Sequence, residues 1–147
     1  MHIRSYNCEV DRVLVLAIFD RTFPVSHSFL EGCEHTKGRQ HLELLLGYSE
    51  TLIAELDGSV LGFITVDDEG YISALYVDCP KFGRGVGSAL LHAAQNRHEW
   101  LRLHVFADNI LAVKFYRSRD FAILEEDCQI DSLGLRHRRF EMERRRI

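Results

Sequence analysis

Glycines at alternate positions, Gly83, Gly85 and Gly87, carry the clearest chemical signal in the sequence. They follow a predicted strand at 71–77, which ends before Pro80, and they lead into a predicted helix. The apolar residues of that helix recur at the i, i+3, i+4 spacing of one buried face: Val86, Ala89, Leu90, Ala93 and Ala94. The first amides of a helix lack intrahelical partners, and glycine lets the main chain approach an anion closely. The junction therefore predicts a phosphate site, with a plain strand-to-helix turn as the alternative.

Two common phosphate motifs do not fit this junction. A P-loop needs a lysine followed by Ser or Thr, which the loop lacks. A dinucleotide motif would place Ser88 or Leu90 where its last glycine belongs. The segment instead resembles the acetyl-CoA loop of the GCN5-related N-acetyltransferases (GNAT), whose signature is [RQ]-x-x-G-x-[GA]. Gly85 and Gly87 match the signature, and Phe82 stands where Arg or Gln is usual, with Lys81 or Arg84 able to supply charge.

A second stretch resembles the same family. GNAT members carry an Asn, then a helix with Ala and Phe-Tyr that ends in Gly-Phe. This chain has Asn109, Phe115-Tyr116 and then Asp120-Phe121 at the matching spacing. Asp120 replaces the glycine, and aspartate tolerates the left-handed φ of such a turn better than most residues. The resemblance implies one domain over 1–147 with an α/β (α+β) fold, a mixed and mostly antiparallel central sheet flanked by helices.

Residue patterns predict the order βααβββαβαββ. The first helix has a buried stripe of Val10, Val13, Leu14, Ala17 and Ile18, starts at the cap Asn7 and ends near Pro24. An irregular stretch at 24–38 precedes a second helix at 39–47. The remaining predicted elements are strands at 2–6, 51–56, 60–66, 71–77, 100–106, 121–124 and 137–142, and a helix at 109–117. Asp57-Gly58 predicts a hairpin, and the turn before the last strand falls at 131–134.

The resemblance also implies roles for individual residues. Main-chain groups of Leu75, Tyr76 and Val77 would pair with the pantetheine arm of acetyl-CoA. The predicted phosphate cradle comprises Phe82, Gly83, Arg84, Gly85, Val86, Gly87 and Ser88. Asn109 and Phe115 are two further predicted cofactor contacts. Tyr116 is the predicted general acid, because a phenol with a pKa of about 10 is protonated at neutral pH and can donate to the leaving thiolate. A tyrosine that merely packs, and an asparagine that merely caps a helix, are the alternatives.

His27, in the irregular stretch, is the predicted general base, with Glu31, Glu34 and Glu43 as weaker candidates. A metal site formed by His27, Cys33, His35 and His41 matches no usual zinc spacing, so no metal is predicted.

Bulk properties narrow the function class. The net charge of −4 argues against a nucleic-acid binder. No apolar run approaches the roughly 20 residues of a membrane span. Scattered cysteines without a signal peptide predict a cytoplasmic protein. Folds of this kind commonly form homodimers through an edge strand, and the residues leave the oligomeric state open.

The sequence thus predicts an acetyl-CoA-dependent N-acetyltransferase that moves an acetyl group directly to an amine. The acceptor is open among a small-molecule amine, an antibiotic, a peptide N-terminus and a protein lysine. The alternative is a coenzyme A-binding sensor or interaction module that retains the cradle without turnover. The replacements at Phe82 and Asp120 favour that alternative, and Tyr116 favours the enzyme.

Overall fold

A computed structural model describes residues 1–78 and 85–145. The element order matches the prediction: β1 (His2–Ser5), α1 (Cys8–Ser26), α2 (Gly32–Leu45), β2 (Glu50–Leu56), β3 (Ser59–Val66), β4 (Ile72–Val77), α3 (Val86–Gln95), β5 (Trp100–Phe106), α4 (Ile110–Arg117), β6 (Ala122–Ile130) and β7 (Arg136–Arg145). Within the described ranges, no helix is both long and apolar enough to cross a membrane.

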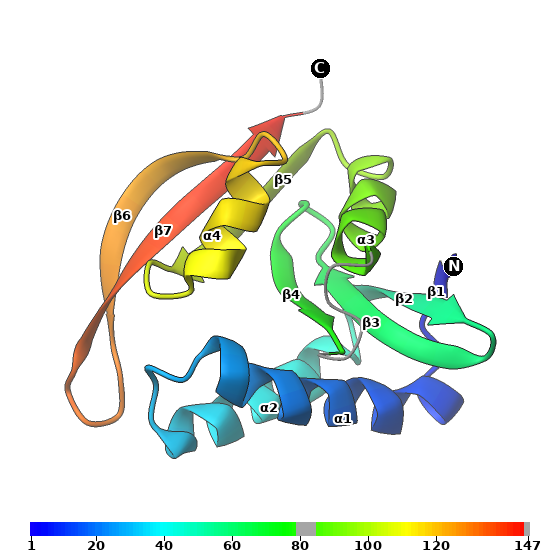
Figure 1. The fold of residues 1–147 in the computed structure, drawn as a ribbon, viewed down its shortest axis with the longest axis horizontal. Coiled ribbons are helices and arrows are strands. Elements are labelled where there is room, and N and C mark those ends of the chain that lie inside the picture. The colour runs from blue at the N-terminus through cyan, green and yellow to red at the C-terminus, as the bar shows by residue number, and fades with distance from the viewer. Residues whose placement is uncertain (79–84, 146–147) are drawn as a thin grey trace.

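The strands form two antiparallel sheets that meet at one point (Figure 1). The first sheet has the order β1-β2-β3-β4 and the second β5-β7-β6. A parallel bridge between Tyr71 and Arg102 joins them, after which β4 and β5 belong to different sheets. The contact is tight because Gly70 has φ of +85°, and a Cβ there would lie 2.1 Å from the Trp100 carbonyl oxygen. The mixed α+β fold class is confirmed, and the central sheet is split into two parts.

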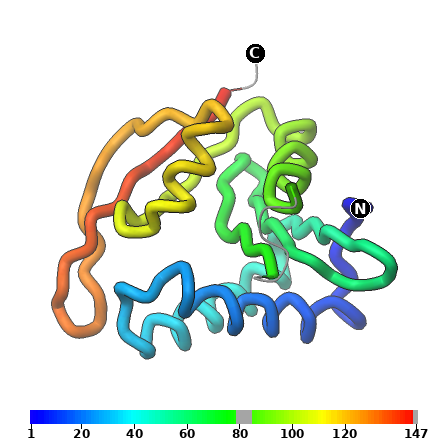
Figure 2. The backbone as a smooth tube through the Cα atoms, viewed as in Figure 1, coloured from blue at the N-terminus to red at the C-terminus, as the bar shows by residue number. Residues whose placement is uncertain are grey.

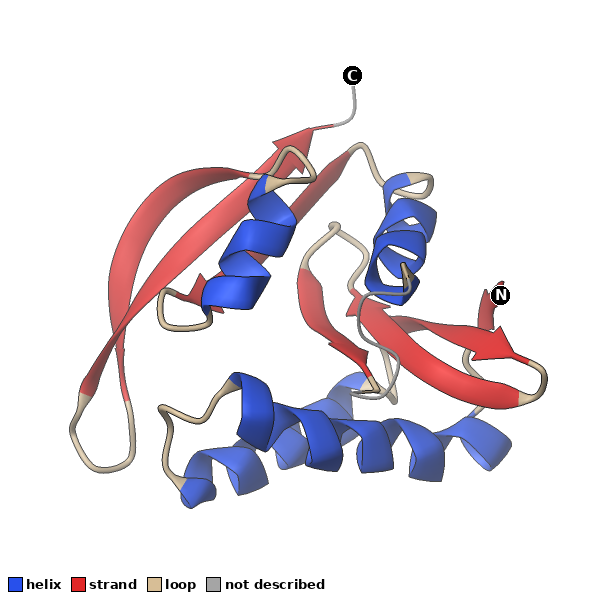
Figure 3. Cartoon of the chain, viewed as in Figure 1, coloured by secondary structure: helices blue, strands red, loops and turns tan. Residues whose placement is uncertain are grey.

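Helices cover both faces of the first sheet (Figures 2 and 3). Leu52 and Ile64 belong to the core under α3, whereas Ile53 and Phe63 belong to the core under α1 and α2. Successive side chains along a strand point to opposite faces of the sheet. Because helices cover both faces here, the side chains on both faces are apolar. The second sheet contributes one face to the core, and every residue of its edge strand β6 is exposed.

The predicted buried stripe of α1 is only partly correct, because Ile18 is buried as predicted and three other residues of the stripe are exposed. Val10 and Val13 are 62% and 77% exposed, and Leu14 is also exposed. The face that packs inward contains Asp11, Val15, Leu16, Ile18, Phe19, Thr22 and Phe23. Apolar residues occur on nearly every side of this helix, so periodicity does not select a face. Asp11 can face inward because Arg4 donates to both of its carboxylate oxygens, at 2.7 and 2.9 Å.

The irregular stretch predicted at 24–38 is mostly helical. Helix α1 continues past Pro24 to Ser26, and α2 already begins at Gly32. A proline removes only its own backbone donor, so the helix can extend for part of another turn. The polar start of α2 is held by tertiary contacts rather than by propensity. His35 Nε2 lies 2.9 Å from Asp20 of α1, and Gly38 allows close approach of the Phe19 ring.

The β-strand predictions hold best where the pattern is strong. Asp57-Gly58 connects β2 and β3 in a hairpin, as predicted, and both residues have positive φ. Strand β5 has the predicted limits, whereas β6 and β7 extend well beyond theirs. Their added residues are mostly polar, so alternation does not reveal them. Cross-strand ion pairs run along the extension, for example Arg138 with Glu126 at 2.7 Å.

Candidate functional site

The N-terminus of α3 has the backbone conformation predicted for the glycine-rich junction. Gly85 caps the helix with φ of +75°, a left-handed value that favours glycine. No acidic residue lies in the first turn of α3, so the positive helix end is not neutralised there. Val86 is buried. Three predicted cradle residues, Phe82, Gly83 and Arg84, lie outside the described residues.

Side chains from two distant elements pack against this helix start. A Cβ on Gly87 would lie 3.4 Å from the Phe115 ring of α4 and 3.7 Å from Val77 of β4. The structure therefore brings together Val77, Gly87 and Phe115, which were predicted to contact the same ligand. Their close approach depends on the absence of a larger side chain at Gly87.

Arg119, which the sequence predictions did not include, contacts two residues of the predicted cofactor site. Its Nε donates to Ser88 Oγ at 3.0 Å, and its guanidinium lies 4.1 Å from the Phe115 ring centroid. Its other contacts among the described residues are hydroxyl and carbonyl oxygens, and none is a carboxylate. The signal was available, because residues 115 and 119 are one helical turn apart. Arg119 places a cation beside the predicted phosphate cradle.

The last residues of β4 present one edge toward the split between the sheets. Leu75, Tyr76 and Val77 pair with β3 on the other edge. The register of β4 changes between Ala74 and Ile72, which leaves Ser73 as an extra residue in a β-bulge. Beyond the bridge at Tyr71, the strand pairings of the described residues link β4 to β3 alone. This edge can therefore accept main-chain hydrogen bonds from an extended ligand.

Tyr116 lies in the core below α4, and its side chain is 8% exposed. Its ring packs edge-on against Phe115 and Phe121, with centroids 5.2 and 5.3 Å apart. Burial raises the pKa of Tyr116 above its ordinary value. Burial, and to a lesser degree the charge of Tyr116, likewise raises the pKa of Tyr76. The phenols of Tyr116 in α4 and Tyr76 in β4 are therefore both protonated at neutral pH.

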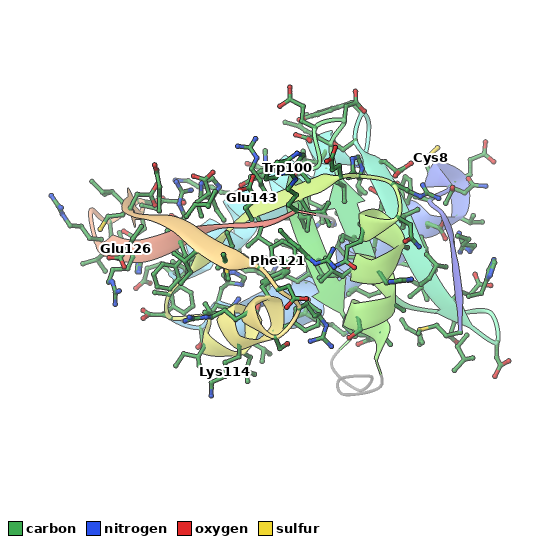
Figure 4. The ribbon with its side chains drawn as sticks, turned by 90° about the horizontal axis from the view of Figure 1, so that it is seen from above. Cys8, Trp100, Lys114, Phe121, Glu126 and Glu143 are labelled. Carbon is green, nitrogen blue, oxygen red and sulfur yellow. The ribbon has the colours of Figure 1, made fainter. Side chains whose placement is uncertain are left out.

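The turn after α4 survives the replacement of glycine by Asp120. Asp120 has φ of +69°, and the Phe121 N–H donates to the Tyr116 carbonyl at 3.1 Å. Figure 4 shows Phe121 toward the middle of the molecule and Lys114 on the outer side of α4.

At the other end of α4, Asn109 accepts from the Ala112 N–H at 3.4 Å, so it acts as the helix cap.

His27 follows α1 and lies in an aromatic cluster. It stacks on Phe23 at 4.3 Å, and its Nδ1 is 2.7 Å from Ser26 Oγ. Its ring centroid is 6.0 Å from that of Phe106 and 6.4 Å from that of Tyr76. Burial lowers the pKa of His27 to about 4. His27 is therefore neutral at pH 7 and a weak proton acceptor.

The carboxylates predicted as weaker bases are mostly engaged. Glu34 accepts from the Ser132 N–H and hydroxyl, at 3.0 and 2.7 Å. Glu43 pairs with Arg12 and Arg39. Across residues 1–78 and 85–145, no three His, Cys, Asp or Glu side chains are grouped as a metal site would require.

A cavity of about 330 Å³ lies between the two long helices and the ends of β5 and β6. Its lining residues are Phe23, Leu30, Glu34, Lys37, Gly38, Phe106, Gln129 and Ile130. The walls combine apolar and polar side chains, and Glu34 and Lys37 supply charge. Ser132, at the tip of the β6–β7 hairpin, bonds to Glu34 and Lys37 and connects the hairpin to α2. The cavity lies beside the cluster that contains His27, because both include Phe23 and Phe106.

Comparison with known proteins agrees with this arrangement. Residues 26–144 match the model of the acetyltransferase (GNAT) domain. The chain therefore belongs to the GNAT acetyltransferase family, as its resemblance in the glycine loop and in α4 predicted.

The relatives include two peptidyl-lysine N-acetyltransferases. YiaC of Escherichia coli K12 is 34% identical over 83 residues, a match that spans 56% of each chain. YjaB of Salmonella typhimurium LT2 is 26% identical over 121 residues, or 82% of each chain. The solution structure of apo YjaB from Escherichia coli has a TM-score of 0.81 at 24% identity and covers 97% of this chain and 95% of its own. That likeness shows the fold.

Proposed function

We propose that the protein transfers the acetyl group of acetyl-CoA directly to an amine, with Tyr116 as the general acid. The observation that carries the proposal is the position of Tyr116. It is buried and protonated, it neighbours Tyr76 of β4, and the adjacent Phe115 packs against the first turn of α3. One small region thus joins a predicted phosphate cradle, an open strand edge and a proton donor.

The described residues suit acetyl-CoA as the acetyl donor. The free amides at the start of α3, together with Arg119, can bind the diphosphate. The edge of β4 at Leu75, Tyr76 and Val77 can pair with the amides of the pantetheine arm. The bulge at Ser73 changes which main-chain groups face the split, and a fixed N–H there would stabilise charge on the thioester oxygen.

Tyr116 would act as the thiolate leaves. Because its pKa is raised, the phenol keeps its proton until negative charge develops on sulfur. The thiol has an ordinary pKa near 8.5, so full proton transfer is unfavourable at the outset. Tyr116 therefore donates a hydrogen bond to the sulfur first, and the proton moves as the carbon–sulfur bond breaks.

We propose a peptidyl lysine as the acceptor class. Both relatives described above are named for that acceptor. The cavity beside Phe106 has an apolar wall formed by Phe23, Leu30 and Ile130. A lysine side chain combines a four-carbon apolar stem with a terminal amine, so it suits an apolar channel that leads toward a polar reaction centre.

The test uses acetyl-CoA and a peptide with a blocked N-terminus and one lysine, with free coenzyme A and peptide mass as readouts. The control peptide carries arginine in place of lysine. We expect acetylation of the lysine peptide only. Binding of coenzyme A by calorimetry without transfer to any amine in a panel would favour the alternative, a binding module without turnover. Absence of coenzyme A binding would overturn both.

A further inference from the structure

A partly buried histidine–carboxylate pair lies near the tip of the β6–β7 hairpin. His137 Nε2 is 2.7 Å from Asp131 Oδ2, and the two side chains are 11% and 3% exposed. Asp131 Oδ1 also accepts from the Leu133 and Leu135 N–H groups. The bond to His137, and then those main-chain bonds, lower the pKa of Asp131. An ionised carboxylate only accepts hydrogen bonds, so Nε2 carries the hydrogen, and Nδ1 of the neutral ring has a lone pair.

The His137 ring lies on the acceptor side of the molecule. Its centroid is 6.1 Å from that of Phe106 and 6.0 Å from that of Phe29, and His27 contacts the same two rings. Phe106 lines the cavity proposed for the acceptor, as does Gln129, which pairs with His137 in the sheet register. His137 therefore lies next to two residues that line this cavity, Phe106 and Gln129.

An amine acceptor is protonated at neutral pH and must lose a proton before it can attack a carbonyl. His27 is poorly suited, because burial lowers its pKa to about 4 and makes it a weak proton acceptor, and its Nδ1 is already 2.7 Å from Ser26 Oγ. Glu34 and Glu43 are held by Ser132 and by arginines. His137 combines a nitrogen that can accept a proton with a fixed carboxylate that compensates the resulting positive charge.

We infer that His137 accepts the proton of the acceptor ammonium, directly or through one water, and that Asp131 is its positioning residue. This inference rests on the proposed acetyl transfer and specifies its base. An N–H bond of the ammonium breaks, and a bond from that hydrogen to His137 Nδ1 forms. The neutral amine then forms the carbon–nitrogen bond as the carbon–sulfur bond breaks. Sulfur takes the Tyr116 proton, Tyr116 regains one from the acylated nitrogen through water, and His137 releases its proton to solvent.

Other charged and titratable groups surround His137 and enter any pH dependence. They are Asp131 in the turn, Arg139 on the same face of β7 with its partner Asp127, His27 across Phe106, and Glu34 and Lys37 at the hairpin tip. Variants at His137 and Asp131 distinguish the contribution of this pair to the pH profile from the contributions of the other groups.

The experiment measures kcat/KM for the blocked lysine peptide from pH 5.5 to 9.5. In His137→Gln, we expect at least a tenfold loss at pH 7 and a rate that rises steadily with pH, because hydroxide must replace the base. In Asp131→Asn, Oδ1 still organises the turn, and we expect the acid limb of the profile to move to lower pH. Affinity for coenzyme A should stay unchanged in both, and the exposed His92→Gln serves as the matched control.

Unchanged pH profiles in His137→Gln would overturn the inference while leaving acetyl transfer intact. Wild-type protein that binds coenzyme A and acetylates no amine would instead overturn the proposed function, and this inference with it. Nitrogen-15 histidine NMR of the wild-type protein provides a readout that needs no variant to fold. We expect hydrogen on Nε2 of His137 and a titration midpoint equal to that of the kinetic acid limb. The opposite tautomer or a different midpoint would overturn the inference.

Discussion

The cofactor side and the acceptor side of the site are built in different ways. The proposed cofactor side uses main-chain groups of β4 and α3, which are close in sequence, with α4 packed against them. The proposed acceptor side uses the side chains of His27, Phe106 and His137, which come from three separate parts of the chain. Main-chain groups can bind any ligand with the matching backbone or phosphate pattern, whereas side chains select among acceptors. The comparison predicts that variants on the two sides affect different steps.

The largest expected effect is loss of turnover with binding retained. Tyr116→Phe should lower kcat by about 100-fold or more, because it removes the proton donor and leaves the packing in place. Affinity for coenzyme A should change little. Steady-state kinetics and calorimetry test this, with the exposed Tyr48→Phe as control. A kcat equal to that of the wild-type protein would remove the acid role from Tyr116.

A change at the α3 N-terminus should act on binding. Gly85→Ala forces an L-residue into a left-handed conformation, which costs about 1–2 kcal/mol of stability. Gly58→Ala in the remote hairpin imposes the same strain, and among the described residues neither Cβ meets a neighbour. We expect equal losses of stability by chemical denaturation. Only Gly85→Ala should weaken coenzyme A binding, by about tenfold. Equal affinities for the two variants would contradict a phosphate cradle at Gly85.

Arg119→Gln should have a smaller effect on the same ligand. The guanidinium is partly exposed and solvent screens it, so we expect about a fivefold loss of coenzyme A affinity with kcat preserved. The salt dependence of binding should weaken as well. Calorimetry at two salt concentrations measures both, with Arg117→Gln, exposed near the end of the same helix, as control. An identical loss in both variants would indicate a general charge effect.

The last prediction concerns stability on the acceptor side. The folded-state pKa of His27 is lowered to about 4 from an ordinary 6.5. The unfolded chain therefore binds the proton more readily, and stability present above pH 6.5 falls as the pH drops toward 4. The contribution of His27 to this slope is at most about 1.4 kcal/mol per pH unit. Denaturation at pH 7.5 and 5 should show a flatter dependence in His27→Gln. An unchanged slope would mean that His27 is not buried in its neutral form.

Local patterns predicted the elements well and the contacts between them less well. The helix after the glycine-rich loop, the Asp57-Gly58 hairpin and the limits of β5 follow from short-range rules, and the described residues confirm each one. The prediction of the buried face of α1 was only partly correct, because apolar residues lie on nearly every side of this helix. The predicted start of α2 was wrong, because the segment before residue 39 is polar and contains glycine. Its helical form is supported by a tertiary contact, in which His35 lies beside Asp20.

The sequence by itself determined the family, the element order and the glycine-rich helix start, because each depends on residues that are near neighbours in the chain. The tertiary structure alone decided that the sheet splits after Tyr71, that Arg119 joins Ser88, and that His137 meets Asp131 beside Phe106. These contacts join strands and helices whose separation along the chain carries no periodic signal. Their geometry depends on how the two sheets pack, which no local pattern encodes.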